Sequence, residues 1–132
     1  MRPDRLLQVA VFFVVALSSS PVGAQSMTPM RGVITSFADE FAVRVFPRNT
    51  YRHQVEVAVR VYDENFRPVR ARTSPSTMML TGGASRPVVV VIPFEGMSER
   101  RVRICTESIP FPDGTTRIKA QICGRFLARR LR

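Results

Sequence analysis

The sequence predicts an all-β protein, an antiparallel β-sandwich of about seven strands. Short segments in which apolar and polar residues alternate follow one another along the chain. A period of two is that of a strand with one buried face. Turn-forming residues separate these segments at intervals of about ten residues, and no segment has the period of a helix. The chain is therefore expected to fold as two stacked sheets.

The predicted strands differ in how clearly they alternate. Residues 53–62 are the clearest, since valine occupies every second position from Val55 to Val61. Residues 88–92 are apolar throughout, as expected of a strand that is covered on both faces or lies in the centre of a sandwich. Residues 30–35 include a glycine and an arginine, which suggests a sheet edge. Strands are predicted at residues 30–35, 41–46, 53–62, 66–70, 78–80 and 88–92, with a loop at 72–76.

The last predicted element is a hairpin over residues 100–126, which contains both cysteines. Asp113-Gly114 indicates the turn, because glycine takes φ > 0 at no steric cost. A short turn centred there pairs residues whose numbers sum to about 228, which places Cys105 opposite Cys123. Both cysteines then lie on the polar face, as a cross-strand disulfide requires. One face carries Val102, Ile104, Ile118, Ala120, Ile122 and Phe126, and the other carries Arg101, Arg103, Cys105, Lys119, Gln121, Cys123 and Arg125.

The first residues have the pattern of a secretory signal peptide. Two arginines precede an apolar run over residues 6–17, and a small-residue cleavage site ends at Ala24. The run is short for a membrane span, so an uncleaved anchor is the less favoured alternative. Residues 1–24 are thus predicted to be removed, leaving residues 25–132 as one domain. Export would also place the two cysteines where a disulfide persists.

The charge is strongly positive, with 20 Lys and Arg against 10 Asp and Glu and a formal net charge of +10. Nearly all of it is arginine, which pairs with carboxylates and phosphates. Acidic partners or anionic surfaces are therefore expected. Nucleic acid is not expected as a partner, because an exported chain leaves the compartment that contains it. An arginine-rich composition without a functional cause remains the alternative.

No enzyme, cofactor or metal site is indicated. His53 is the only histidine, and neither a Gly-x-Ser-x-Gly nor a Cys-x-x-Cys spacing occurs. The basic face of the hairpin is the more informative feature, because the register places Arg103 opposite Arg125, with Lys119 on the same side. Like charges that face each other across strands are destabilising, and an anionic partner would reverse that cost. Solvated arginines that splay apart are the alternative.

Four segments, in their order along the chain, resemble the N-terminal immunoglobulin-like domain of the periplasmic pilus-assembly chaperones, the PapD-like family. Residues 27–31 are similar to the family's opening strand, with a basic residue shortly after a proline. Residues 80–85 resemble the glycine turn before its fifth strand. Residues 102–110 look like its sixth strand, and residues 124–129 lie where its seventh strand carries a basic residue. Some members also join their last two strands by a disulfide.

The resemblance implies a periplasmic, non-enzymatic protein with an immunoglobulin-like sandwich and a pilus subunit as partner. In the family, the seventh strand adds to an incomplete subunit, and two basic residues hold the subunit's C-terminal carboxylate. These roles would fall to Arg31 and Arg125, with Lys119 a weaker candidate for the second. The alternating donor side chains would be Ile118, Ala120 and Ile122.

Two departures from the family bear on this expectation. Family members carry a second domain of similar size, whereas this chain is expected to be a single-domain form. Gly124 is expected to interrupt the donor strand. The alternative is a structural or surface-associated sandwich that docks on anionic lipid or polysaccharide through its basic face.

Overall fold

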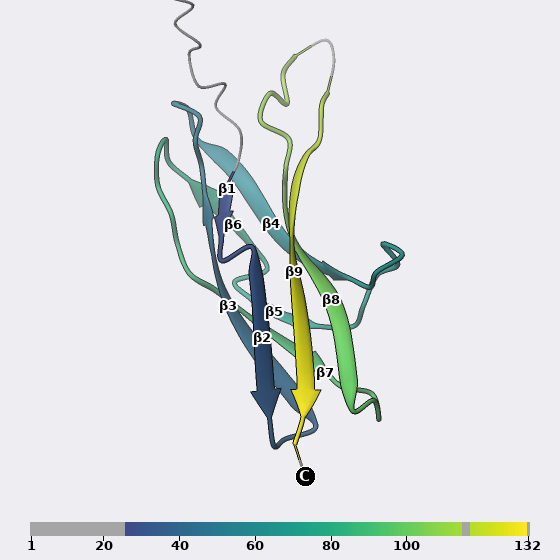
Figure 1. Ribbon diagram of the computed structural model, residues 1–132. Helices are drawn as coiled ribbons and strands as arrows, with labels where there is room; N and C mark the ends of the chain where they lie inside the picture. Colours follow the sequence, from purple (N-terminus) through teal and green to yellow (C-terminus); the bar gives the residue numbers. More distant parts are fainter. Residues whose placement is uncertain (1–25, 115–116, 132) are drawn as a thin grey trace, which may run out of the picture.

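A computed structural model describes residues 26–114 and 117–131, which form nine strands in two sheets (Figure 1). The predicted signal peptide lies outside the described residues. The four-stranded sheet has the order β1 (Ser26–Thr28), β3 (Glu40–Arg48), β7 (Val88–Pro93) and β5 (Arg72–Ser74). The five-stranded sheet has the order β2 (Arg31–Ser36), β9 (Ala120–Arg130), β8 (Glu99–Ser108), β4 (Val55–Tyr62) and β6 (Thr77–Leu80).

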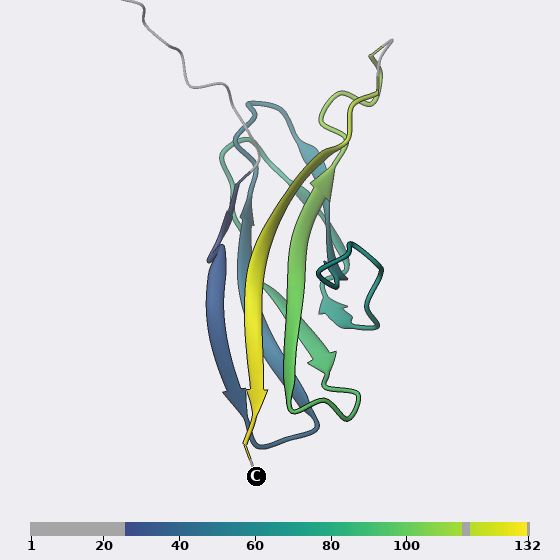
Figure 2. The ribbon, with the colours of Figure 1, turned by 45° about the vertical axis from the view of Figure 1, so that its right-hand side comes forward.

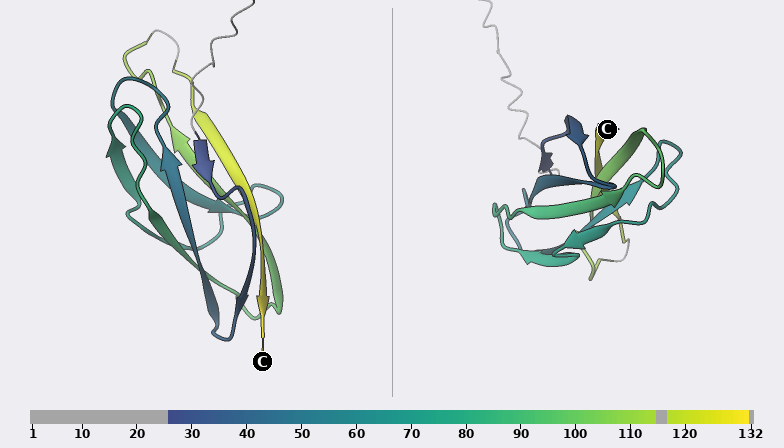
Figure 3. Two further views of the ribbon diagram at one scale, coloured as in Figure 1. Left: turned by 60° about the vertical axis from the view of Figure 1, so that its left-hand side comes forward. Right: turned by 90° about the horizontal axis from the view of Figure 1, so that it is seen from below.

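The two sheets face each other as the layers of a sandwich (Figure 3). The predicted all-β fold is therefore confirmed. The described residues contain no helix, and so none that could cross a membrane.

Apolar residues at every second position of the long strands form the core between the sheets. The valines of β4 from Val55 to Val61 are buried at every second position, as predicted. They share a hydrophobic cluster with Phe41 of β3 and Ile92 of β7. Burying each such side chain stabilises the fold by about 1.5–3 kcal/mol. β7 lies between β3 and β5, which confirms its predicted central position.

The first strands cross from one sheet to the other. β1 pairs with β3 in the four-stranded sheet, and β2 then pairs with β9 in the five-stranded sheet. β2 lies at an edge, as predicted, but its pairing with β9 is parallel, and their arrows point the same way in Figure 1. Among the described strands, pairing is therefore antiparallel except between β2 and β9.

Two short elements differ from the prediction. Residues 66–70 form no strand, only a single bridge between Tyr62 and Pro68, because proline has no N–H to donate to a ladder. The predicted loop at 72–76 contains β5, whose three residues pair with β7. Three residues are too few to show a period in the sequence.

The register of the final hairpin is confirmed. Cys105 lies opposite Cys123 in the β8–β9 ladder, and a disulfide joins them. The predicted short turn is wrong, since β8 ends at Ser108 and β9 begins only at Ala120. Two prolines, Pro110 and Pro112, follow β8 closely and cannot donate backbone hydrogen bonds. Residues 118 and 119 consequently lie in the loop before β9, and residues 115 and 116 lie outside the described residues.

Candidate functional site: an open strand edge beside a row of arginines

Along one of its two edges, β9 pairs with a neighbouring strand over only part of its length. On one flank it pairs with β8 from Ala120 to Arg129. On the other flank its pairing with β2 begins only at Arg125 (Figure 2). No described strand pairs with residues 120–124 on that flank. These residues, called here the open edge, can accept another strand.

The register shows which backbone groups face the open edge. The N–H of Arg125 donates to the carbonyl of Met30 at 2.9 Å, so it points toward β2. Backbone groups alternate in direction along a strand, so those of Gln121 and Cys123 point to the same side. The 4.0 Å between the Cα atoms of Cys105 and Cys123 agrees with this, because close approach marks a pair that is not hydrogen-bonded to each other.

Of the three predicted donor side chains, the structure places two on one face of β9. Ala120 and Ile122 are half-buried and share the face of Phe126, whereas Ile118 lies in the loop and is 61% exposed. Gly124 does not interrupt the strand, contrary to expectation. A Cβ there would lie 2.8 Å from the Phe126 ring and 3.0 Å from the Met30 carbonyl. Glycine therefore lets the crossing between β1 and β2 approach β9.

Three arginines lie side by side where the open edge ends. Arg31 of β2 is opposite Arg125 of β9, and Arg125 is opposite Arg103 of β8. Directly opposed residues point to the same face, so these three, called here the arginine row, share the outer face of the five-stranded sheet. None has a carboxylate within ion-pair distance among the described residues. Together with Val33 and Leu127 they line an open pocket of about 790 Å³.

Arg103 is held in place by a loop. Its guanidinium carbon lies 4.5 Å from the centre of the Phe66 ring, a cation–π contact. Phe66 has a φ of 58°, which is rare for a bulky residue. The Asp63 carboxylate supports this turn by accepting the N–H groups of Asn65 and Arg67 at 2.8 and 2.9 Å. The Nε of Arg103 is buried and has no hydrogen-bond partner in the structure.

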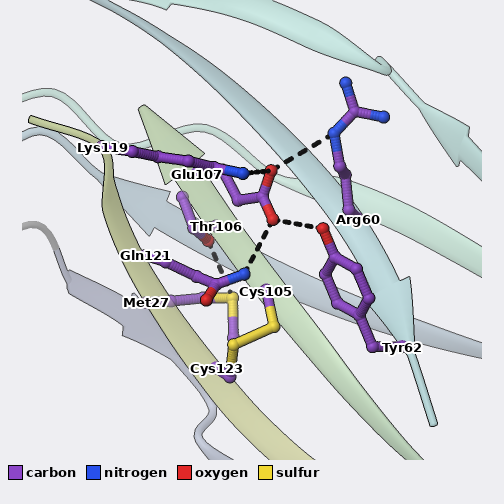
Figure 4. The surroundings of a disulfide bond; sticks show 9 residues. All are labelled: Met27, Arg60, Tyr62, Cys105, Thr106, Glu107, Lys119, Gln121 and Cys123. Atoms are coloured by element: carbon purple, nitrogen blue, oxygen red, sulfur yellow. Dashed lines mark hydrogen bonds and ion pairs between the residues drawn. A yellow bond between two sulfur atoms is a disulfide. The ribbon is translucent and has the colours of Figure 1, made fainter. Parts of the chain in front are cut away.

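A buried carboxylate, Glu107, anchors the same face nearer the hairpin loop (Figure 4). It is 5% exposed and accepts hydrogen bonds from the Tyr62 hydroxyl and from Gln121 Nε2 at 2.8 Å. It also pairs with Lys119 Nζ at 3.0 Å and with Arg60 Nε at 3.3 Å. Burial raises the pKa of Glu107, but the hydrogen bonds from Tyr62, Lys119 and Gln121 outweigh it and hold the pKa below its usual value. The hydrogen bond to Glu107, with burial, raises the pKa of Tyr62.

The network around Glu107 was not predicted from the sequence. It also holds one predicted site residue away from the arginine row. Lys119 is paired with an internal carboxylate and does not line the pocket of the arginine row. The same register that aligns the cysteines places Glu107 opposite Gln121 on the polar face. That alignment was the available signal, but nothing in the sequence indicated that the surrounding side chains bury the carboxylate.

The single histidine has a structural position. His53 Nε2 is 2.5 Å from the carbonyl oxygen of Pro110, and its ring packs with those of Tyr51 and Phe111. These contacts fasten the base of the hairpin loop to the segment before β4. Within residues 26–114 and 117–131, no three His, Cys, Asp or Glu side chains gather closely enough to hold a metal ion.

The two sheets, the crossing from β1 to β2 and the disulfide between the last two strands define the class of fold, an immunoglobulin-like sandwich of the PapD-like type. The resemblance found in the sequence is thus confirmed at the level of the fold. No protein-family model matches the sequence, and no curated protein is similar to it by sequence.

Solved structures with this fold include two bacterial chaperones and a human domain. The E. coli chaperone DraB matches with a TM-score of 0.67 at 17% identity, over 81% of this chain and 55% of its own. The SafB chaperone of Salmonella enterica, solved in complex with the SafA pilin, matches with a TM-score of 0.67 at 11% identity, over 84% of this chain and 56% of its own. The PapD-like domain of human CEP192 matches with a TM-score of 0.58 at 13% identity, over 83% of this chain and 86% of its own.

This chain therefore spans about half the length of the solved chaperone chains that it matches. The fold also occurs in a human protein, so the fold by itself does not determine the partner. The open edge and the arginine row are therefore the features that bear on function.

Proposed function

We propose that this protein is an exported, non-enzymatic, chaperone-like protein that binds a partner polypeptide, such as a pilus subunit, by strand addition at the open edge of β9. The observation that carries the proposal is the position of Arg31 and Arg125, which lie side by side where that edge ends. The SafB chaperone, which has the same fold, was solved with a pilin. The matching bacterial proteins are described as chaperones, which favours binding over catalysis.

The arginines select the direction of the added strand. A strand on the open edge that runs parallel to β9 reaches the beginning of β2 with its C-terminal end. There its carboxylate can accept charge-assisted hydrogen bonds from Arg31 and Arg125. An antiparallel strand would bring its terminal ammonium to the same two guanidinium groups, and like charges repel. The partner strand is therefore expected to be parallel and to end at the arginine pair.

The backbone supplies affinity and the side chains supply register. The N–H and C=O groups of Gln121 and Cys123 pair with the incoming strand, while Ala120 and Ile122 contact its alternate side chains. Ile118 lies beyond the strand and is available to contact the partner from the loop. Lys119 contributes only if it leaves Glu107, so the carboxylate is assigned to the two arginines.

Export to the periplasm is part of the proposal. It rests on the signal-peptide pattern of residues 1–24 and is supported by the disulfide, since such bonds persist in oxidising compartments. Docking on anionic lipid or polysaccharide, the alternative drawn from the basic face, has no support in the chaperone structures that match.

The proposal is tested with a short acetylated peptide in which valine alternates with threonine and which ends in glutamine with a free carboxylate. It should bind the oxidised protein. Amidation of its C-terminus, or the double variant Arg31→Gln, Arg125→Gln, should each weaken binding by about tenfold or more, because charged hydrogen bonds are lost. Arg44→Gln, on the outer face of the other sheet, is the matched control. Equal binding by the free and amidated peptides would refute the carboxylate anchor.

A further inference from the structure

The arginine row carries more positive charge than one carboxylate balances. Its three guanidinium groups stand on three adjacent strands, and charges of one sign that face each other across strands are destabilising. Other basic residues of this face are already compensated. Arg101 pairs with Glu64 at 3.5 Å and with Glu99 at 3.7 Å, and Glu107 pairs with both Arg60 and Lys119. No described carboxylate lies within ion-pair distance of the row, and Glu64, which also lines its pocket, is paired with Arg101.

A single C-terminal carboxylate held by Arg31 and Arg125 would leave the guanidinium of Arg103 without an acceptor. The pair Arg31 and Arg125 holds one carboxylate, and Arg103 lies one strand further from the open edge. Its stacking on Phe66 limits the conformations of the side chain, and its buried Nε has no acceptor in the structure. A buried donor without a partner is costly, and an acceptor supplied by a ligand removes that cost.

We infer that the row binds a partner whose C-terminal residue is acidic, so that the chain end carries two carboxylates. This inference rests on the proposed function and names the class of chain end that the site selects. The α-carboxylate would lie between Arg31 and Arg125, and the side-chain carboxylate between Arg125 and Arg103. Neighbouring strands are about 4.8 Å apart, a separation that the two carboxylates of a terminal glutamate can span. Each can then accept hydrogen bonds from two guanidinium groups.

An apolar part of the same pocket favours an amino-acid side chain over a bare anion. Val33, which is 65% exposed, and Leu127 are opposite each other one step along the same face. They form an apolar surface beside the row, within the same pocket. The methylene groups of a terminal glutamate can pack there, whereas a phosphate ion would leave this surface in water.

The first test uses two small probes that are too short to add a strand. N-acetylglutamate carries two carboxylates and N-acetylglutamine carries one. Each is titrated into the oxidised protein while the backbone amide signals of Arg31 and Arg125, which remain in every variant, are followed by NMR. N-acetylglutamate should bind about tenfold more tightly, because it adds charged hydrogen bonds to Arg103. That preference should disappear in Arg103→Gln and persist in the control Arg44→Gln.

Equal affinity for the two probes would overturn the inference. So would inorganic phosphate that binds as tightly as N-acetylglutamate, a result that would point instead to a phosphate headgroup on a lipid. If Arg103→Gln fails to fold, Arg103→Lys keeps the charge but loses the planar fork, and its preference for N-acetylglutamate should also fall. A preference unchanged in this variant would argue against a role for Arg103.

The second test separates the inference from the proposed function. The valine–threonine peptide is made with either glutamate or glutamine as its free C-terminal residue. Tighter binding of the glutamate form supports both proposals, and equal binding of the two forms overturns the inference alone. A third outcome is that neither peptide binds, while N-acetylglutamate still binds more tightly than N-acetylglutamine and this preference requires Arg103. In that case strand addition is wrong and the two-carboxylate site stands.

Discussion

The carboxylate of Glu107 shows how one residue organises the outer face of the five-stranded sheet. It lies on β8 beside the disulfide, and side chains from β4, β9 and the hairpin loop cover it. A buried charge is tolerated only where donors satisfy it, and here Tyr62, Gln121 and Lys119 do so. The network therefore joins the hairpin to β4 at the level where the open edge begins.

Replacing this carboxylate is predicted to destabilise the fold. Glu107→Ala should lower the free energy of unfolding by about 2 kcal/mol, because charged hydrogen bonds are lost and the Tyr62 hydroxyl loses its acceptor. The exposed partners Arg60 and Lys119 contribute little to this value. Urea denaturation measures the change. Glu56→Ala, an exposed position of the same sheet, is the control and should alter stability by less than about 0.5 kcal/mol.

The same residue predicts how stability depends on pH. The pKa of Glu107 is lower in the folded chain than in the unfolded chain. Its contribution is therefore complete above the pH where an unfolded glutamate titrates, and it is lost as the pH falls through the folded pKa. The raised pKa of Tyr62 acts in the opposite sense, so its contribution is lost at alkaline pH. Urea denaturation at a series of pH values should show both effects. In Glu107→Gln, the free energy of unfolding should fall less as the pH is lowered.

At the scale of the element, β9 has two halves with different surroundings. Its second half is paired on both sides, by β8 and by β2. Its first half has one partner and is held to β8 by the disulfide at Cys123. Within this half, the amides of Gln121 and Cys123 face the open edge and that of Ile122 faces β8. The element is thus a stable strand with a short exposed ladder.

A proline at the open edge is predicted to block binding without unfolding the protein. Gln121→Pro removes an N–H that faces the open edge, so the β8–β9 ladder keeps its hydrogen bonds. Binding of the valine–threonine peptide should become undetectable, while circular dichroism stays unchanged. Gln121→Ala is the control, because it also loses the side-chain hydrogen bond to Glu107 but keeps the backbone N–H. Strong binding by the proline variant would show that the partner does not pair there.

Removal of the disulfide is predicted to lower stability. The bond links residues 18 positions apart in sequence, and closing a loop of this length stabilises a fold by about 3 kcal/mol in the chain-entropy picture. The double variant Cys105→Ala, Cys123→Ala should lose about this amount in urea denaturation. A loss below about 1 kcal/mol would mean that the network around Glu107 is enough to hold the hairpin together.

At the scale of the whole molecule, the sequence predicted what is encoded locally. Alternation of apolar and polar residues predicted β3 and β4, because each has one buried face, and a continuous apolar run predicted β7. The Asp-Gly signal and the two cysteines gave the register of the hairpin, although Pro110 and Pro112 move the ends of its strands. What depends on distant pairing was missed. β1 and β5 are too short to show a period, and the parallel pairing of β2 with β9 depends on the crossing of the chain between sheets.

The candidate site was predicted in part for the same reason. Arg31 and Arg125 were named from the resemblance, but only the β2–β9 register shows that they are neighbours. Arg103 was placed opposite Arg125 by the hairpin register, which the structure confirms. The contact of Phe66 with Arg103 could not be predicted, because it depends on the left-handed backbone of one loop residue.

The central claim is that a partner strand pairs with the first half of β9. Amide hydrogen exchange of the oxidised protein, with and without the valine–threonine peptide, measures this most directly. The amides of Gln121 and Cys123 should exchange more slowly when the peptide is bound, and those of Ile122 and Gly124, which already face β8, should change little. Protection that appears on another strand, or equal protection of all four amides, would contradict the account.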